Sequence, residues 1–133
     1  MFGRSLLPLS LVAAGLVTLS ACHLGGVHTP PQVTKANIAL GDSLFNSGAC
    51  QRCHGKGGVG AANAPALDGK KWLQAKTGSY DEIVKIITDG VAQTAIKEPT
   101  HRFPMRARGG PMNLTDPQVQ AVAAYVWTLS HKK

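Results

Sequence analysis

The stretch Cys50-Gln51-Arg52-Cys53-His54 decides how this sequence is interpreted. It holds two thiols separated by two residues, and a histidine directly after the second thiol. Two thiols at this spacing can add across the two vinyl groups of a haem, and the adjacent imidazole is then directed under the ring to bind the iron. The pattern Cys-x-x-Cys-His is typical of c-type haem attachment, and its single copy predicts one covalently attached haem c.

Three other uses of the two cysteines find less support in the sequence. A zinc site would need a second pair of ligands, and the chain offers neither a further cysteine pair nor two histidines at helical spacing. A thioredoxin-like redox pair belongs in a strand–helix–strand context, which the sequence lacks. A disulfide between Cys50 and Cys53 would close a small, strained loop with little entropic gain.

Length and composition fit a small chain built around a cofactor. The 133 residues allow one small domain and exclude a nucleotide-binding fold with a second domain. Only 5% of the residues are aromatic, and 15 glycines and 8 prolines indicate long loops, so the protein's own apolar core is thin. Domains of this size often need a metal, disulfides or a cofactor for stability. Three cysteines exclude complete disulfide pairing.

The N-terminal residues predict export. Residues 1–4 are positively charged, and residues 5–18 are apolar but too few for a transmembrane helix, which needs ~20 apolar residues. This pattern is typical of a secretory signal peptide. The next four residues, Leu19-Ser20-Ala21-Cys22, resemble the lipobox of bacterial lipoproteins, in which the cysteine is acylated and becomes the new N-terminus. An ordinary signal peptide with an unrelated cysteine and a transmembrane anchor are the alternatives.

The lipobox resemblance divides the chain into three parts. Residues 1–21 would be a lipoprotein signal peptide, residues 22–35 a lipidated flexible tether rich in glycine and proline, and residues 36–133 the folded domain. Several acyl chains on Cys22 would anchor the protein stably, because a single chain binds a membrane only marginally.

Three main helices are expected in the domain, and no segment alternates like a strand. The first covers residues 36–48, with Gly48 at its end. The second opens with the capping box Ser79-Tyr80-Asp81-Glu82 and ends at Gly90. The third opens with a second capping box, Thr115-Asp116-Pro117-Gln118, and runs toward the C-terminus. The sequence therefore predicts an all-α domain with long loops between its helices.

A second axial ligand for the iron would have to come from downstream of His54. Four side chains carry a suitable donor atom: Met105, Met112, His101 and His131. A methionine ligand raises the reduction potential relative to a histidine ligand. Donor chemistry alone leaves all four as candidates.

The residues after Met105 carry a resemblance to a known family. Met-Arg-Ala-Arg-Gly-Gly from Met105, Asn-Leu-Thr-Asp from Asn113 and the Cys-x-x-Cys-His motif make residues 36–129 resemble class I c-type cytochromes, most of all the cytochrome c5-like subgroup. The resemblance implies a small cytochrome c fold wrapped around one haem. It also implies that His54 and Met105 bind the iron, with Met112 as the alternative. The family usually has Met-Pro at this point, whereas this chain has Pro104-Met105-Arg106.

The resemblance implies roles for three further residues at the haem. Asn63-Ala64-Pro65-Ala66-Leu67 is similar to a loop in which the proline carbonyl accepts a hydrogen bond from the proximal histidine, so Pro65 would orient His54. Leu67 would pack on the haem face. Trp72 would lie at the haem edge, where its indole N–H could donate to a propionate; a simple packing role is the alternative.

The same resemblance predicts how the first and last helices meet. Gly41 and Phe45 match a small-plus-aromatic pair on the first helix, and Tyr125 matches the aromatic residue on the helix that crosses it. The small glycine would let the two backbones approach closely.

An iron with a protein ligand on each face has no position left for a substrate or O₂, so the sequence predicts electron transfer and not an enzyme. A dihaem peroxidase would need a second Cys-x-x-Cys-His motif, and a dehydrogenase would need a second domain. The sequence is compatible with two such functions: a membrane-anchored periplasmic electron carrier, and an electron-transfer subunit of a larger oxidoreductase complex. A non-haem binding module that uses a metal or a thiol is a third.

The formal net charge of +7 indicates what kind of redox partner the protein could bind. Basic side chains gather near Met105 and around Trp72: Arg102, Arg106, Arg108, Lys70, Lys71 and Lys76. Such a rim would steer an acidic redox partner toward the haem edge, and a generally basic, solvated surface is the alternative. Nucleic acid is not an expected partner of an exported haem protein.

Overall fold

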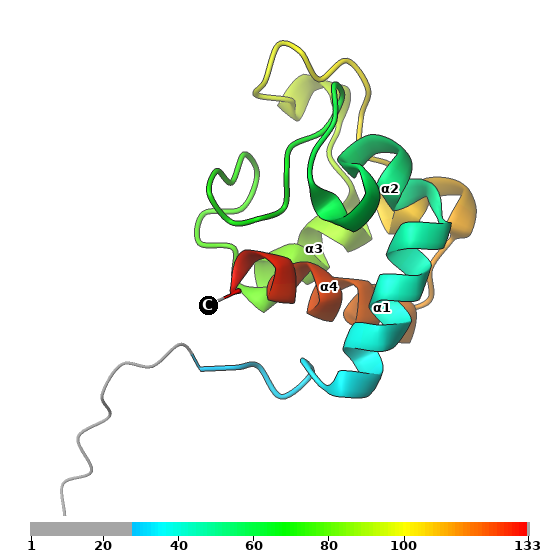
Figure 1. Cartoon of the computed structure of the whole chain (residues 1–133). Coiled ribbons are helices and arrows are strands. Elements are labelled where there is room, and N and C mark those ends of the chain that lie inside the picture. The colour runs from blue at the N-terminus through cyan, green and yellow to red at the C-terminus, as the bar shows by residue number, and fades with distance from the viewer. Residues whose placement is uncertain (1–27, 133) are drawn as a thin grey trace, which may run out of the picture.

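The computed structural model describes residues 28–132 (Figure 1). The predicted signal peptide, Cys22 and the first part of the predicted tether lie outside the described residues. The described chain contains four α-helices, α1 (Lys35–Ser47), α2 (Ala49–His54), α3 (Tyr80–Asp89) and α4 (Asp116–Ser130), and the 3₁₀ helices η1 (Lys56–Gly58), η2 (Gln93–Ala95) and η3 (Ala107–Met112). Over residues 28–132 only two isolated β-bridges occur, so the predicted all-α class is confirmed.

The three predicted helices are α1, α3 and α4, and the local signals that predicted them are present in the structure. Gly48 follows the last residue of α1, and Gly90 caps α3 by donating its backbone N–H to Ile86 O. The capping boxes at the starts of α3 and α4 are both formed. The short helix α2 is additional: Gly48, with an extended backbone, separates it from α1, and it carries the whole Cys-x-x-Cys-His motif.

The end of the predicted tether is part of the fold. The backbone N–H of Val33 donates to Pro30 O (2.9 Å), and the Val33 side chain packs against the core. Asn37 Nδ2 in α1 donates to Gln32 O (2.8 Å). Residues 30–34 therefore form a turn on α1, and α1 begins at Lys35, inside the range assigned to the tether.

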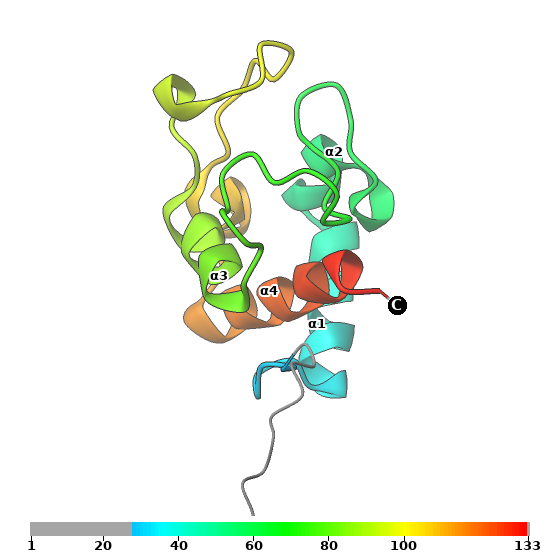
Figure 2. The same cartoon turned by 90° about the vertical axis from the view of Figure 1, so that its left-hand side faces the viewer.

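α4 packs against α1 on one side and against α3 on the other (Figure 2). At the α1–α4 crossing, a Cβ atom on Gly41 would collide with the Ala121 carbonyl oxygen and would lie 2.9 Å from Tyr125 Cβ. Phe45 is 1% exposed, and its ring centroid lies 5.4 Å from that of Tyr125. The predicted close crossing of the first and last helices is confirmed, and it requires glycine at position 41 for lack of space.

The loops on either side of α3 run to the same end of the molecule. In Figures 1 and 2 the segment after α2 (green) and the segment between α3 and η3 (yellow) both extend away from α4 to the top of the view. α2 lies beside them at that end. The fold thus brings the Cys-x-x-Cys-His motif and the segment that contains Met105 to one end of the domain. Within residues 28–132, no helix has both the length and the apolar character to span a bilayer.

Candidate haem-binding site

α2 presents the two thiols of the motif on one helical turn. Cys50 and Cys53 are three residues apart, so their side chains share a face of the helix. Both thiols are free; Cys50 is half-buried and Cys53 is exposed. Burial raises the pKa of the Cys50 thiol above its usual range. The disulfide considered from the sequence is not formed.

The His54 ring is held by a single backbone acceptor. Its Nδ1 lies 3.0 Å from Pro65 O, and because a carbonyl oxygen can only accept, Nδ1 donates this hydrogen bond. Burial lowers the pKa of His54, and the neutral ring so favoured is the form that binds metals. Nε2 is consequently left with its lone pair for iron. The hydrogen bond that the family resemblance implied is present in the structure.

The loop that supplies Pro65 folds back over α2. Gly60 N–H donates to His54 O (2.6 Å), and Leu67 N–H donates to Gly58 O (2.8 Å). Leu67 is buried, and a Cβ on Gly58 would lie 3.4 Å from Leu67 Cβ. These short-range contacts place Leu67 in the core and keep Pro65 against the histidine.

Trp72 has a packing contact of its own. Its indole ring lies directly on Gly78, where any Cβ would overlap Nε1 and the ring carbons, and the side chain packs against the core. Gly78 is in turn held by the Glu82 carboxylate, which accepts its backbone N–H at 3.0 Å. The structure thus supports the packing role for Trp72, and its contact with a haem propionate stays a prediction.

Glu82 orders the chain between Trp72 and α3. Its carboxylate accepts the backbone N–H groups of Lys76, Thr77, Gly78 and Ser79, together with the Thr77 hydroxyl. These hydrogen bonds, that from the Thr77 backbone first, lower the pKa of Glu82 to about 2. The sequence predicted Glu82 only as half of a capping box, and nothing in its spacing indicated the other donors.

The backbone of Met105 is fixed to the end of α3. Val91 N–H donates to Met105 O (2.8 Å), and Met105 N–H donates to Val91 O (3.1 Å), which makes an antiparallel bridge. Gly90 allows this approach, since a Cβ there would collide with Met105 O and lie 2.7 Å from Ala107 N. Met105 is half-buried and packs against the core. Sequence reasoning assigned Gly90 to the helix end and missed its contact with the methionine.

The other three candidate ligands have different surroundings. The Met112 Sδ accepts the backbone N–H of Ala49 at 3.2 Å. The His131 ring stacks on Trp127, with centroids 4.0 Å apart, and its Nδ1 lies 2.9 Å from Trp127 O. His101 lines a groove of about 350 Å³ together with Pro65. Of the three, only His101 therefore shares a groove with the residue that holds His54.

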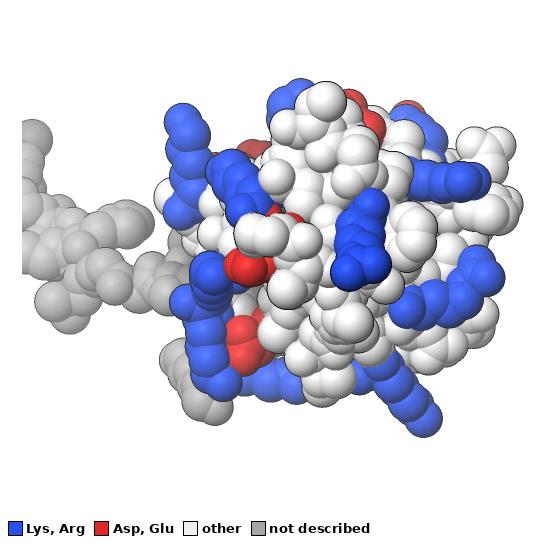
Figure 3. Space-filling model, turned by 90° about the horizontal axis from the view of Figure 1, so that it is seen from above, with Lys and Arg blue, Asp and Glu red and all other residues white. Residues whose placement is uncertain are grey.

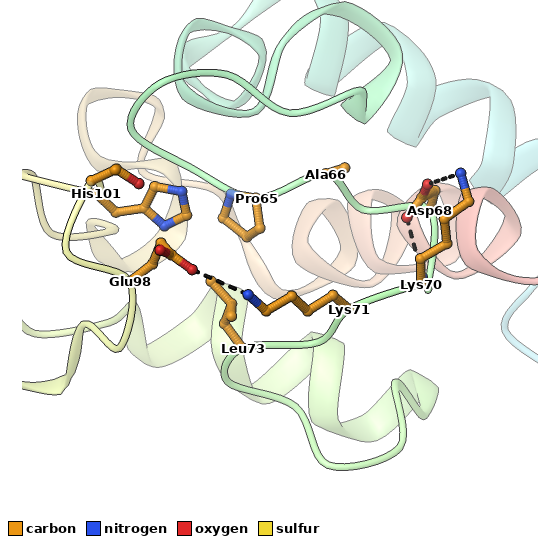
Figure 4. Close-up of a pocket in the computed structure, with 9 residues that line it drawn as sticks. Pro65, Ala66, Asp68, Lys70, Lys71, Leu73, Glu98 and His101 are labelled. Atoms are coloured by element: carbon orange, nitrogen blue, oxygen red, sulfur yellow. Dashed lines mark hydrogen bonds and ion pairs between the residues drawn. The ribbon is translucent and has the colours of Figure 1, made fainter.

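Figure 4 shows that groove between the loop after α2 and the segment before Met105. Pro65 and His101 lie side by side at one end of it. Glu98 lies just below His101 in this view, and Lys71 Nζ reaches across to Glu98 Oε2 at 3.2 Å. The groove is the place where the two loops that flank the site approach each other.

The donor set of the site fits haem c. Two free thiols lie on one face of α2, and the adjacent imidazole has one nitrogen engaged and one available. Two methionines, Met105 and Met112, lie on the segment between α3 and α4. No group of three or more His, Cys, Asp or Glu residues that could form a metal cage is found in residues 28–132. Fold and site together define a monohaem c-type cytochrome, whose cofactor is one haem c.

Comparison with known proteins gives the family. Residues 36–126 match the family described as cytochrome c oxidase, cbb3-type, subunit III, and the chain belongs to this family. It is 33% identical over 115 residues to the cbb3-type cytochrome c oxidase subunit FixP of Bradyrhizobium diazoefficiens, covering 86% of this chain and 38% of that protein. It is 30% identical over 118 residues to subunit CcoP of Azospirillum brasilense, covering 88% of this chain and 39% of that protein. The chain thus spans under two fifths of these relatives' length.

Two solved structures show the same fold. Cytochrome cL of Methylophaga aminisulfidivorans has a TM-score of 0.54 at 24% identity, over 71% of this chain and 56% of that one. The c-type cytochrome XoxG of Methylobacterium extorquens has a TM-score of 0.50 at 23% identity, over 71% of this chain and 50% of that one. The predicted class of c-type cytochrome is confirmed, and assignment to the c5-like subgroup stays a prediction.

Proposed function

We propose that the protein transfers single electrons through one haem c bound by Cys50, Cys53 and His54, with Met105 as the distal ligand. The observation that carries this proposal is the hydrogen bond from His54 Nδ1 to Pro65 O, beside two free thiols on α2. When bound, haem c supplies an Fe(III)/Fe(II) couple. The residues around it orient the His54 ring, place the buried Leu67 beside it and hold the Met105 backbone.

Absorption spectroscopy and mass spectrometry test this proposal. The protein is expressed with a haem-attachment system, and a spectrum of the dithionite-reduced membrane fraction is recorded. We expect the α, β and Soret bands of a c-type cytochrome, and one haem in the denatured mass. Acid–acetone extraction should leave the colour on the protein. A colourless pellet would contradict the proposal and favour a non-haem binding module.

Met105 is preferred as distal ligand because its position is fixed from two sides. The bridge to Val91 sets its backbone, and its side chain packs against the core next to the loops of the site. The Met112 sulfur already has a partner in Ala49, and His131 is engaged by Trp127. His101, which lines the groove with Pro65, is the candidate to test if Met105 fails.

A partner with an acidic face fits the charge of the site's end of the molecule. In Figure 3, which views the molecule from above, Lys and Arg side chains are spread over this face, including near its centre, with some Asp and Glu side chains among them. Lys76, Arg102 and Arg106 are exposed, as is Phe103 at 64%. Arg108 is different, because it donates to Leu114 O (2.9 Å) and to Asp116 Oδ1 (2.7 Å). We therefore remove Arg108 from the predicted rim, where it serves the fold instead.

Two settings for the electron transfer are compatible with the site. One is a free periplasmic carrier, held at the membrane by lipidated Cys22 after removal of residues 1–21. The other is an electron-transfer subunit of a larger oxidoreductase, which is favoured by the match to cbb3-type oxidase subunits. Purification in mild detergent separates them: a carrier elutes alone, and a subunit elutes with a catalytic chain.

The anchor has its own test. The Cys22→Ser variant should lose lipidation and remain unprocessed at the lipobox, and globomycin should block processing of the parent. If the variant is processed and held at the membrane like the parent, the anchor lies elsewhere.

A further inference from the structure

The segment from Met105 to Met112 contains two methionines, and the second one contacts the start of α2. Met112 Sδ accepts the backbone N–H of Ala49 at 3.2 Å, across 63 residues of sequence. Ala49 is the first residue of α2 and directly precedes Cys50. The Met112 thioether therefore touches the helix that carries all three haem-attachment residues.

The sulfur is enclosed by two glycines. A Cβ on Gly48 would overlap both Sδ and Cε of Met112, and a Cβ on Gly109 would lie 3.2 Å from the same sulfur. Gly109 also has a positive φ of 69°, a conformation that other residues seldom adopt. A side chain at position 48 would therefore displace the Met112 thioether from the start of α2.

α2 has no other cap at this end. Its N-cap, Gly48, has no side chain to accept the first free N–H groups of the helix. In α1, α3 and α4 a side chain at the N-cap or in a capping box does this. At α2 the acceptor comes from a distant segment instead.

The Met112 segment is itself anchored firmly. The Arg108 guanidinium donates to Leu114 O and to Asp116 Oδ1, and Leu114 N–H donates to Arg108 O at 3.0 Å. Leu114 is 2% exposed. These bonds fix η3 to the start of α4. The contact of Met112 with Ala49 therefore positions α2 relative to α4.

We propose that Met112 is a positioning residue whose thioether caps α2 and holds the haem-attachment helix in register with the distal segment. The inference rests on the proposed function only in that α2 carries haem, and it assigns the Met112 sulfur to Ala49 and not to iron. Loss of this acceptor frees the start of α2, and the orientation of Cys50 and His54 loosens with it.

The test uses the full-length haem-loaded protein and three variants. Met112→Leu removes the acceptor and keeps the apolar volume, whereas Met112→Gln replaces the thioether with an amide oxygen that can also accept. Val119→Ala, at a buried position of α4, is the control for a general loss of stability. Amide hydrogen exchange at Ala49, the fraction of chains with both thioethers formed, and the reduction potential are measured.

For Met112→Leu we expect Ala49 exchange roughly two- to tenfold faster, as for the loss of one hydrogen bond. We also expect a smaller fraction of doubly attached haem and a shifted potential. Met112→Gln should restore the exchange rate, and Val119→Ala should leave all three readouts near the parent's. Unchanged Ala49 exchange in Met112→Leu would overturn the inference.

The same variants separate this inference from the identity of the iron ligand. If Met112→Leu abolishes the sulfur-to-iron band and lets carbon monoxide bind, Met112 is the ligand and the inference is wrong. If Met112→Leu gives the expected exchange and Met105→Ala leaves the band intact, the inference holds and the Met105 assignment fails.

Discussion

Residues 48–67 and residues 90–112 supply the two sides of the candidate haem site, and they differ in the range of the contacts that shape them. On the first side, His54 bonds to Pro65, Gly60 to His54 and Leu67 to Gly58, all within one short stretch of chain. On the second side, Met105 is held by Val91 and Met112 by Ala49. The ring of His54 is thus oriented by contacts within its own stretch of chain, whereas the contact of Met112 with the start of α2 depends on the assembled fold.

The largest effect is expected on the attachment side. The double variant Cys50→Ser, Cys53→Ser cannot form thioethers, so we expect complete loss of covalent haem and, because the haem supplies much of the core, a poorly folded chain. The measurement is the denatured mass and the colour after acid–acetone extraction. Cys22→Ser is the control, since that thiol is outside the motif and should leave haem attachment unchanged. Haem that stays bound after extraction of the double variant would refute the attachment site.

Removal of the distal ligand should give the next largest effect. Met105→Ala is expected to abolish the weak sulfur-to-iron band and to admit carbon monoxide to the iron. It should also lower the potential by on the order of 0.1 V, within the ~0.8 V range set by axial ligands. Haem should remain covalently bound, because Cys50 and Cys53 are unchanged in this variant. If spectrum and potential are those of the parent, His101 becomes the residue to replace.

A third prediction probes the bridge that holds Met105. Gly90→Ala would force a Cβ against Met105 O and Ala107 N, so we expect a loss of about 1–3 kcal/mol in unfolding free energy and a weaker sulfur-to-iron band. Gly57→Ala is the control for a positive φ alone: Gly57 has φ 70° and ψ 12°, against 73° and −168° at Gly90, and a Cβ there would meet nothing within 4 Å. That variant should lose only about 1 kcal/mol and keep the band. Equal band intensities in the two variants would show that the Gly90 contact does not position Met105.

The smallest effect concerns pH. Because hydrogen bonds lower the pKa of Glu82 to about 2 in the folded state, the ionised carboxylate stabilises the fold fully above its unfolded pKa of about 4.5. This contribution should be lost as the pH falls from about 4.5 to about 2. In Glu82→Gln, the unfolding midpoint should vary less over that interval, with Asp81→Asn as the control on the same helical turn. Denaturant titrations at several pH values measure it, and parallel curves for parent and Glu82→Gln would contradict the assignment.

Much of the local structure could be predicted because its causes are local. The capping boxes at Ser79 and Thr115 need residues only three positions apart, and the terminating glycines are adjacent to the helices they end. The close crossing at Gly41 was also predicted, from a resemblance and not from spacing. The separate helix α2 was missed because six residues are too few to show a period.

From the sequence alone we could predict the attachment chemistry, the all-α class and the positions of the three main helices, since each depends on residues close together along the chain. The tertiary structure alone decided that Met105 is bound to Val91 and Met112 to Ala49, and that Trp72 lies on Gly78. The Met112–Ala49 contact joins residues far apart in sequence, and the other two join loop residues whose spacing follows no helical or strand period. Two methionines seven positions apart are equal as donors, and beyond the family resemblance it is the segments that the fold places against them that distinguish them.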